Sequence, residues 1–481
     1  MPMNPFRPGV MPFAVVMAAV VASPLLGVGV ARAQTLQEAL SQAYANNPTL
    51  QAQRAQLRVV DENVPQALAG WRPSVVVAGN AGYVNGQTRS RTSDIFGNTR
   101  PVYSDADRQT AGLNATVTQP LYSGGRTQAA TKRAENQVLA QRARLLAAEQ
   151  QVLSDVVQAY VAVIRDQETL RLNVNNVQVL QRQLDATNER FRVGEITRTD
   201  VAQAESRLAG ARSARANAEG TLQTSRATFR RVVGLAPERL VAPQPLSVPV
   251  RAEADAREVA MRNNPAVVAA LFDEAAARDA VDVQMAALLP QVSVQAQAFR
   301  SDNQQQPHTR GTGQQITANL SVPLYQGGAE HAAVRQARQD AVRLRQVVDD
   351  QRRRAMQQAT QAWEGLQSAR AQVESVRAQI RAAEIALDGV QREAVVGSRT
   401  TLDVLNAEQE LLNARVTLVQ ALSSVVTASY NLAGAVGRLT ARDLAVPVAQ
   451  YDMEAYYNTV RSRWFGTGDY SQGGGRQQEV R

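Results

Sequence analysis

The chain contains no cysteine, only two histidines and few aromatic residues, which make up 5% of its 481 residues. Without cysteine there is no disulfide framework, no thiolate metal site, no thiol catalysis and no lipid anchor on an N-terminal cysteine. His308 and His331 show no ligand spacing, and the sequence carries neither a phosphate-binding glycine loop nor a nucleophile motif. We therefore expect a protein that is not an enzyme and that uses no metal or cofactor.

Lysine is also nearly absent. Of the 52 basic residues Lys132 is the only lysine, so the net charge of +9 comes almost wholly from arginine. A basic balance permits a nucleic-acid partner, but it can equally arise from GC-rich coding. The charge alone does not decide between these interpretations.

The N-terminal segment 1–33 has the features of a secretory signal peptide. Arg7 precedes an apolar stretch over 10–30, and the small-x-small pattern at 31–33 fits signal peptidase cleavage. An uncleaved membrane anchor is the alternative. No later segment supplies about 20 consecutive apolar residues, so we expect no transmembrane helix after it. The exported chain then either dissolves or enters a membrane as strands.

The rest of the sequence consists of two tandem repeats. An Asn-Asn-Pro motif at 46–48 recurs at 263–265, and Pro-Leu-Tyr-x-Gly-Gly at 120–125 recurs at 323–328. The distance between copies falls from 217 to 203 residues, which predicts a loop that is longer in the first half. The predicted units are a signal peptide (1–33), a first repeat (34–234), a Pro-rich linker (235–250), a second repeat (251–443) and a C-terminal tail (444–481).

Each repeat alternates between the two regular periods. Alternation of apolar and polar residues predicts strand pairs over 74–122 and 291–325, with about ten residues per strand, the length that crosses a bilayer when tilted. The polar stretches 85–110 and 301–315 are interpreted as loops. Helical patterns predict long helices with a heptad seam over 126–192 and 328–395, and shorter helices over 36–69, 197–232, 254–288 and 400–436. Two short helices placed end to end can lie beside one long helix.

Four strands cannot close a barrel, and an open sheet edge does not persist in lipid. Four strands per chain therefore require a dimer with eight strands or a trimer with twelve. The polar face of the strands suits a water-filled bore, which favours the trimer. A soluble sandwich is the alternative, but it does not explain strands of bilayer length.

The ordered motifs resemble the TolC family of outer-membrane channels. The resemblance covers about 35–443 and is carried by the segment from Thr35 to Pro48, the paired Pro-Leu-Tyr-x-Gly-Gly motifs and the segment 396–406. It implies a mixed α/β membrane protein: a homotrimer with a twelve-stranded outer-membrane barrel, continuous with a long periplasmic helical coiled-coil barrel. Residues 444–481 would form an equatorial tail that is disordered from about Tyr470. The lipidated cysteine of some members is missing, so the chain resembles TolC itself more closely.

A Gly-x-x-Thr-x-x-Asp pattern joins the helices of each predicted hairpin. Glycine can end one helix in a left-handed conformation, threonine can cap the next, and aspartate at the third position completes a capping box. By resemblance, these turns form the periplasmic mouth that an adaptor protein binds. The residues concerned are Gly194, Thr197 and Asp200 in the first repeat, and Gly397, Thr400 and Asp403 in the second.

The resemblance also implies a constriction and a gate at this mouth. Asp403 matches one position of the family's acidic ring, whereas Asn406 replaces an acid at the next, so we expect modest cation selectivity. Arg399 and Glu168 match the polar link that keeps the mouth closed, although Ala394 stands at the family's aromatic gate position. An ordinary exposed ion pair, worth under about 1 kcal/mol, is the alternative interpretation of the Arg399–Glu168 pair.

The function implied is a passive exit duct of a tripartite exporter. Its partners would be a periplasmic adaptor, an inner-membrane pump of the proton-driven RND or the ATP-binding-cassette class, and outer-membrane lipid, with no nucleic acid. A periplasmic adaptor and a basic coiled-coil protein acting on nucleic acid are the competing hypotheses. The sequence does not name the cargo, which could be small molecules or secreted protein.

Overall fold

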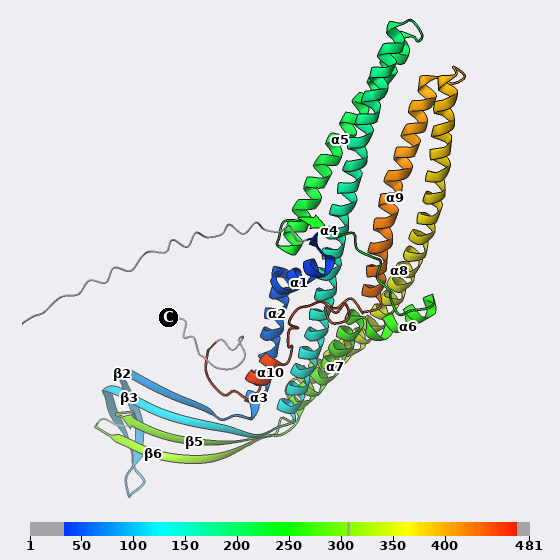
Figure 1. Ribbon diagram of the computed structural model, residues 1–481. Helices are drawn as coiled ribbons and strands as arrows, with labels where there is room; N and C mark the ends of the chain where they lie inside the picture. The colour runs from blue at the N-terminus through cyan, green and yellow to red at the C-terminus, as the bar shows by residue number, and fades with distance from the viewer. Residues whose placement is uncertain (1–32, 305–307, 469–481) are drawn as a thin grey trace, which may run out of the picture.

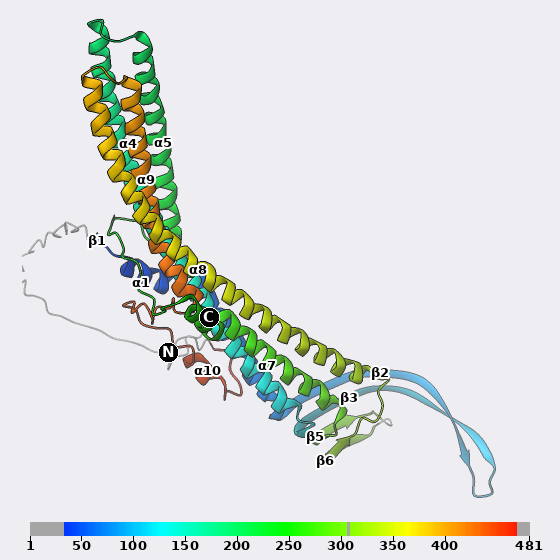
Figure 2. The ribbon, with the colours of Figure 1, turned by 90° about the vertical axis from the view of Figure 1, so that its right-hand side faces the viewer.

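A computed structural model describes residues 33–304 and 308–468, so the predicted signal peptide (save its last residue) and the predicted disordered end lie outside the described residues. The molecule is elongated: two helical hairpins form one end, and a four-stranded sheet forms the other (Figure 1). Figure 2 shows that the helical shaft bends about halfway between these ends. The arrangement separates a strand region from a distant pair of helical tips.

The two repeats fold into the same series of elements. The first contains α1 (Leu36–Asn46), α2 (Pro48–Asp61), α3 (Asn63–Leu68), η1 (Ala69–Trp71), β2 (Ser74–Ser93), β3 (Thr99–Ser123), α4 (Arg126–Arg192) and α5 (Arg198–Val233). The second contains α6 (Glu253–Asn263), α7 (Pro265–Met285), η2 (Ala286–Leu288), β5 (Gln291–Asp302), β6 (Arg310–Ser321), α8 (Ala329–Val395) and α9 (Thr401–Ala435). The short elements β1 (Ala33–Gln34), β4 (Arg239–Leu240) and α10 (Ala455–Val460) lie outside this series. The long helix α4 has the predicted bounds, and α8 begins one residue later than predicted.

The repeated Asn-Asn-Pro motif joins the short helices end to end. The Asn47 side chain caps α2 by accepting from the Thr49 amide at 2.9 Å, while its Nδ2 donates to the Val232 carbonyl of α5 at 3.0 Å. Asn264 does the same in the second repeat, accepting from Ala266 at 2.9 Å and donating to Ala435 at 3.4 Å. The first pair packs along α4, and the second along α8. The predicted end-to-end arrangement is thereby confirmed.

All four long strands form one antiparallel sheet in the order β2-β3-β5-β6. The pairing of β3 with β5 joins the two repeats, with a register shift between Pro120 and Tyr122. β2 and β6 are edge strands within the chain, and their outer N–H and C=O groups need strands from other chains before they can enter lipid. The sheet is therefore one sector of a larger barrel.

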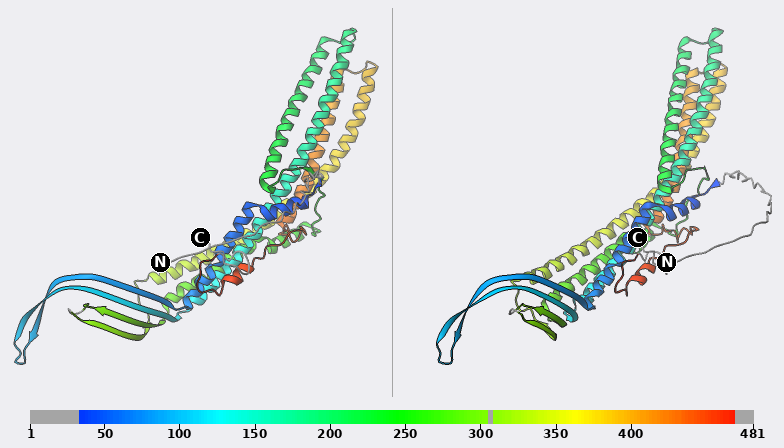
Figure 3. Two further views of the ribbon diagram at one scale, coloured as in Figure 1. Left: turned by 60° about the vertical axis from the view of Figure 1, so that its left-hand side comes forward. Right: turned by 90° about the vertical axis from the view of Figure 1, so that its left-hand side faces the viewer.

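The first strand pair is much longer than predicted, and the assignment of 85–110 as a loop is wrong. The ladder continues from Asn85↔Asp107 to Ser93↔Thr99, and only 94–98 form the turn. Backbone hydrogen bonds build the ladder, so side chains that are polar on both faces are tolerated where both faces are exposed. This hairpin extends well beyond β5 and β6 (Figure 3).

The second strand pair also differs from the prediction at both ends. Strand β5 continues to Asp302, and β6 already begins at Arg310. The loop between them is therefore shorter than the predicted 301–315. The last strand ends at Ser321 and not at residue 325, because Pro323 has no N–H to donate to a ladder. The extra length of the first half, predicted from the change in repeat distance, lies in its strand hairpin.

The middle of the shaft is wrapped by the chain's N-terminal, linker and C-terminal segments. Tyr160 of α4 is fully buried; its hydroxyl donates to the Gln34 carbonyl at 2.8 Å and accepts from the Val241 amide at 3.0 Å. Burial raises the pKa of Tyr160 to about 12. The C-terminal segment up to residue 468 packs in the same core cluster and is also held by Arg142–Glu454 (3.0 Å) and Arg461–Glu135 (2.9 Å). These contacts form a collar around α4.

One helix within the described residues, α9, is long and apolar enough to cross a membrane by length and composition alone. The prediction that no such helix follows the signal peptide is therefore too strict. Leu405, Leu432 and Ala433 of α9 are buried against other helices, and α9 packs on both α8 and α4. This packing uses part of its apolar surface, since 28% of its most apolar 18-residue window is buried.

Candidate functional site

Two capped turns form the helical tips of the molecule. Gly194 (φ +82°) and Gly397 (φ +79°) leave α4 and α8 in the left-handed conformation that glycine adopts without strain. Thr197 and Thr400 then cap α5 and α9 with complete capping boxes. The predicted capping roles are confirmed at both turns, and each turn has a backbone fixed by its own sequence.

The capping aspartates are held in their ionised form. Asp200 Oδ2 accepts from the Thr197 amide at 3.0 Å, and Asp403 Oδ2 accepts from the Thr400 amide at 3.0 Å. The hydrogen bond from the Thr197 hydroxyl holds the pKa of Asp200 below its usual range, and the Thr400 amide does the same for the pKa of Asp403. Asp403 is thus a fixed negative charge beside the tip.

Each tip turn also carries its own ion pair. Arg190 binds Glu195 at 2.6 Å in the first turn, and Arg399 binds Glu393 at 2.9 Å in the second. All four side chains are well exposed, so each pair is screened by solvent and contributes little to stability. Their main effect is to orient the turns.

Between the paired charges both tips expose valine. Val193 is 76% exposed on the first turn, and Val395 and Val396 are 88% and 78% exposed on the second. Scattered exposed apolar residues are common, but here they sit on both rigid turns at the end of the molecule. They give each tip an exposed apolar surface of its own, and we call these three residues the tip valines.

Just behind the tips the two hairpins meet in a contact that we call the seam. Leu405 of α9 is 2% exposed and packs in a cluster whose other members lie on α4 and α5. Those members are Leu180, Leu184, Ala204, Leu208 and Ala211, with Val177 and Val201 partly buried beside them. Leu405 therefore inserts from one hairpin into the apolar core of the other.

A polar bond lies beside this leucine. Arg207 of α5 donates to Asn406 Oδ1 of α9 at 2.7 Å. The structure thus places Asn406, which the sequence assigned to a constriction, in a direct link between the hairpins. Arg207 and Leu405 were missed by the sequence reasoning, and the apolar spacing of α9 was the only signal that could have indicated the leucine.

The predicted Arg399–Glu168 gate pair is not formed in this chain. Arg399 is paired with Glu393 within its own turn, and Glu168 is paired with Arg171 at 2.8 Å one turn along α4. Glu168 lies 24 residues before the end of α4, about 36 Å down the shaft at 1.5 Å per residue. The link that joins the hairpins near the tips is Arg207–Asn406.

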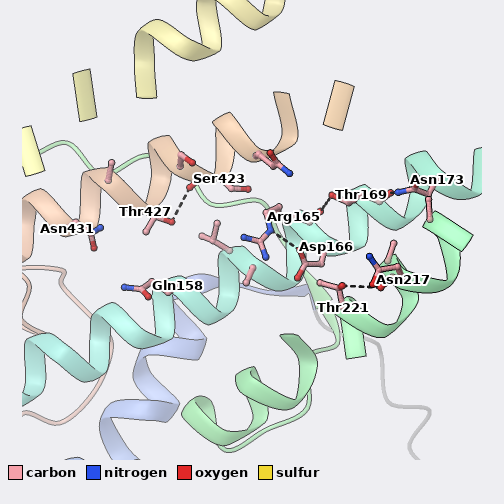
Figure 4. A pocket seen from close by; sticks show the side chains of 17 residues that line it. Gln158, Arg165, Asp166, Thr169, Asn173, Asn217, Thr221, Ser423, Thr427 and Asn431 are labelled. Carbon is pink, nitrogen blue, oxygen red and sulfur yellow. Dashed lines mark hydrogen bonds and ion pairs between the residues drawn. The ribbon is translucent and has the colours of Figure 1, made fainter. Parts of the chain in front are cut away.

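Further down the shaft a polar groove of about 1040 Å³ runs between α4, α5 and α9 (Figure 4). Its labelled side chains include Gln158, Thr169, Asn217 and Thr427, and the one acid among them, Asp166, accepts from Ser225 and from Arg165. On α4 these residues lie on the face opposite Tyr160 and the collar. Mostly uncharged polar side chains therefore line this groove, on the face of α4 away from the collar.

Metal chemistry finds no support in this part of the molecule. Over residues 33–304 and 308–468 no group of three or more His, Cys, Asp or Glu side chains is placed to hold a metal ion. His308 lies in the β5–β6 turn and His331 near the start of α8, far apart in the fold.

A four-stranded sheet with two open edges, joined to a long helical shaft with a polar groove, defines a class of protein. It is the subunit of an oligomeric outer-membrane channel whose barrel and tunnel are completed by other copies. The model of the family described as "Outer membrane efflux protein" matches residues 39–235 and 256–438. The chain belongs to this family, of which TolC is a member.

Individual relatives agree with this assignment. The chain is 36% identical to the outer membrane efflux protein BepC of Brucella suis over 437 residues, covering 91% of this chain and 92% of BepC. It is 23% identical to the outer membrane protein TolC of Escherichia coli, covering 86% and 84% of the two chains. The fold matches the CmeC outer membrane channel of Campylobacter jejuni with a TM-score of 0.72 at 14% identity, covering 89% of each chain.

Family membership confirms the fold and the general function. The protein is an efflux or secretion channel of the outer membrane with a periplasmic extension, a trimer that works with export partners, and a transport protein and not an enzyme. The alternatives of an adaptor, a soluble sandwich, an eight-stranded dimer and a nucleic-acid-binding coiled coil are wrong. With four strands per chain, a trimer supplies twelve.

Proposed function

We propose that this chain is the exit channel of a small-molecule efflux system and that its tips bind a periplasmic adaptor protein. The relative with 36% identity is itself named an efflux protein, which favours efflux over type I protein secretion. The observation that carries the docking role is the tip valines, presented on turns fixed by capping boxes. Because such turns lose little freedom on binding, they suit a recurring protein contact.

The partner behind the adaptor is proposed to be a proton-driven pump of the inner membrane. The channel has no energy source of its own, since it is a passive transport protein. An ATP-binding-cassette exporter is the second candidate, and it would imply protein secretion through the same mouth. In either case we propose that the adaptor binds the channel at its tips.

The seam is proposed to hold the mouth closed. Leu405 and the Arg207–Asn406 bond join α9 to the neighbouring hairpin just behind the tips. Widening the mouth requires the hairpins to separate, and this seam is the contact that must break first. Asp403 keeps its charge nearby, so the trimer carries three fixed negative charges and is proposed to be modestly cation-selective.

Photo-crosslinking in cells tests the docking proposal. A photoreactive residue is placed at Ser398 in the second tip turn, and a matched one at Arg377, which is exposed on α8 about 27 Å before the end of that helix. We expect Ser398 to capture an adaptor together with a proton-driven pump, identified by mass spectrometry. Capture with an ATP-binding-cassette exporter would redirect the proposal to protein secretion. Equal capture at both positions, or no adaptor at Ser398, would contradict it.

A further inference from the structure

An acidic side chain lies between the two hairpins beside the seam, although the contacts proposed to close the mouth do not involve it. Glu408 follows Leu405 by three residues on α9 and is half-buried among α4, α8 and α9. Its Oε2 is buried, and no donor within the described residues reaches it. Its Oε1 accepts only a long bond, 3.5 Å, from Gln391 of α8. A carboxylate in this position is poorly solvated as long as the hairpins are packed.

The surroundings of Glu408 are mainly apolar. A cavity of about 120 Å³ adjoins it. Five apolar residues line this cavity (Leu172, Val179, Leu387, Leu411 and Leu412), together with Asn175, Asn176 and Arg415. The cavity lies between α4 and the α8–α9 hairpin, so its walls separate when the hairpins part.

The charged groups that face Glu408 do not neutralise it fully. From α4, Arg182 acts through its charge, at a distance too long for a hydrogen bond. From α9, Arg415 also lines the cavity and is bonded to Glu384 of α8 at 2.9 Å. Arg182 donates to the Gln178 carbonyl at 3.3 Å, so both arginines next to Glu408 already have polar partners.

We propose that Glu408 is the proton-responsive contact of the seam: a protonated Glu408 favours the packed, closed mouth, and an ionised Glu408 favours separation of the hairpins. This inference rests on the proposed role of the seam. It adds a position that sets the closed state and a direction in which the pH of the periplasm acts on it.

The sign follows from the burial of the carboxyl group. Burial raises the pKa of Glu408 above its usual 4.5 in the packed state, and the Gln391 bond and Arg182 only partly oppose this. Once the hairpins part and water reaches the carboxyl group, the pKa returns towards 4.5. The closed state therefore binds the proton more tightly, and the closed-to-open ratio rises as pH falls through the raised pKa. It changes about tenfold for each pH unit that separates the two pKa values.

Single-channel recording of the purified trimer in planar bilayers tests this inference. We expect the open fraction of the wild-type channel to fall as pH is lowered from 8 to 5. Glu408→Gln, a neutral side chain of the same shape, should stay at the low open fraction at every pH. Glu410→Gln removes an exposed acid from the same helix and should behave as the wild type. Asp200 and Asp403 stay ionised over this range because their caps lower their pKa.

A second variant keeps the test decisive if Glu408→Gln does not assemble. Arg182 lowers the pKa of Glu408, so Arg182→Gln should move the midpoint of the pH response to higher pH. Because the chain has no cysteine, Ala204→Cys provides a single thiol in the Leu405 cluster. Its maleimide labelling should slow at acidic pH beyond the intrinsic slowing measured on an exposed thiol introduced at Ser398.

The possible failures can be told apart. If Glu408→Gln keeps the pH response of the wild-type channel, Glu408 is not the proton-responsive group. The proposed role of the seam in closing the mouth would not be affected by that result. Channels whose open fraction is unaffected by any seam substitution would overturn the seam as the closing contact, and the role of Glu408 with it.

Discussion

Removing the side chain of Leu405 should open the mouth. The leucine is 2% exposed, and the remaining members of its cluster lie on α4 and α5. Leu405→Ala therefore removes contacts between the hairpins and leaves the contacts within each hairpin in place. The substitution acts on the closed state more than on the open state, in which the leucine is already separated from the cluster.

The size of the effect can be worked from the burial. A fully buried Leu→Ala substitution costs about 2–5 kcal/mol, depending on how far the cavity collapses. Taking the lower end, about 2 kcal/mol, the closed-to-open ratio falls by about thirtyfold, since about 1.4 kcal/mol corresponds to a factor of ten. The Arg207–Asn406 bond remains and keeps the two hairpins in register.

Bilayer recordings at neutral pH measure this ratio directly. We expect long open periods of higher conductance for Leu405→Ala, while Leu422→Ala, a 43% exposed leucine on the same helix, resembles the wild type. Trimer assembly and outer-membrane insertion should be unchanged, because the strand region is distant from the seam. An open fraction for Leu405→Ala within twofold of the wild type would refute the reasoning.

Three further predictions concern other parts of the chain. Asn47→Ala removes the cap of α2 and its bond to Val232, so the melting temperature should fall by the equivalent of about 1–2 kcal/mol, and an unchanged value would show that the junction is not stabilising. Burial raises the pKa of Asp61 to about 6, so its ionisation destabilises the fold as pH rises from 3.8 to 6. Asp61→Asn should melt at a higher temperature than the wild type at pH 7.5 but not at pH 3.5, and equal gains at both would contradict this. Asp403→Asn should reduce the cation preference measured as a reversal potential in a salt gradient, and the charge is not part of the constriction if that potential is unaltered.

Features that depend on local sequence were predicted well. The tip turns follow from Gly, Thr and Asp at fixed spacing, because glycine in the left-handed region and a capping box require only neighbouring residues. The bounds of α4 follow from a sustained helical pattern between Gly125 and Val193. The Asn-Asn-Pro repeat was visible, although its second role, a bond from Asn47 to a carbonyl 185 residues away, was not.

The distal strand hairpin was missed because its side chains carry no alternation. From Asn85 and Asp107 outwards, both faces of the strands carry mainly polar side chains. An alternation of apolar and polar residues is therefore not visible in the sequence. The strands form here because the backbone N–H and C=O groups of β2 and β3 pair with each other beyond the predicted bilayer-length segment. The polar composition of 85–110 therefore indicated solvent exposure correctly, but the prediction that this segment is a loop was wrong.

Contacts between the hairpins could not be derived from the sequence. Arg207 and Asn406 are 199 residues apart, and their meeting depends on the relative register of two helices from different repeats. Displacement by one residue turns a helical side chain by about 100°, so no pattern within either helix selects the partner. The Arg399–Glu168 pair was implied by the family resemblance, and in this chain Arg399 instead binds Glu393, six residues earlier.

Binding of the exporter at the tips can be measured by dye accumulation in cells whose own copy of this chain is deleted. The wild-type chain should restore low accumulation of an efflux dye. Val396→Asp, which places a charge in the tip valines, should reach the outer membrane as a trimer and yet leave accumulation high, whereas Val396→Ile should export normally. Full export by Val396→Asp would contradict the account.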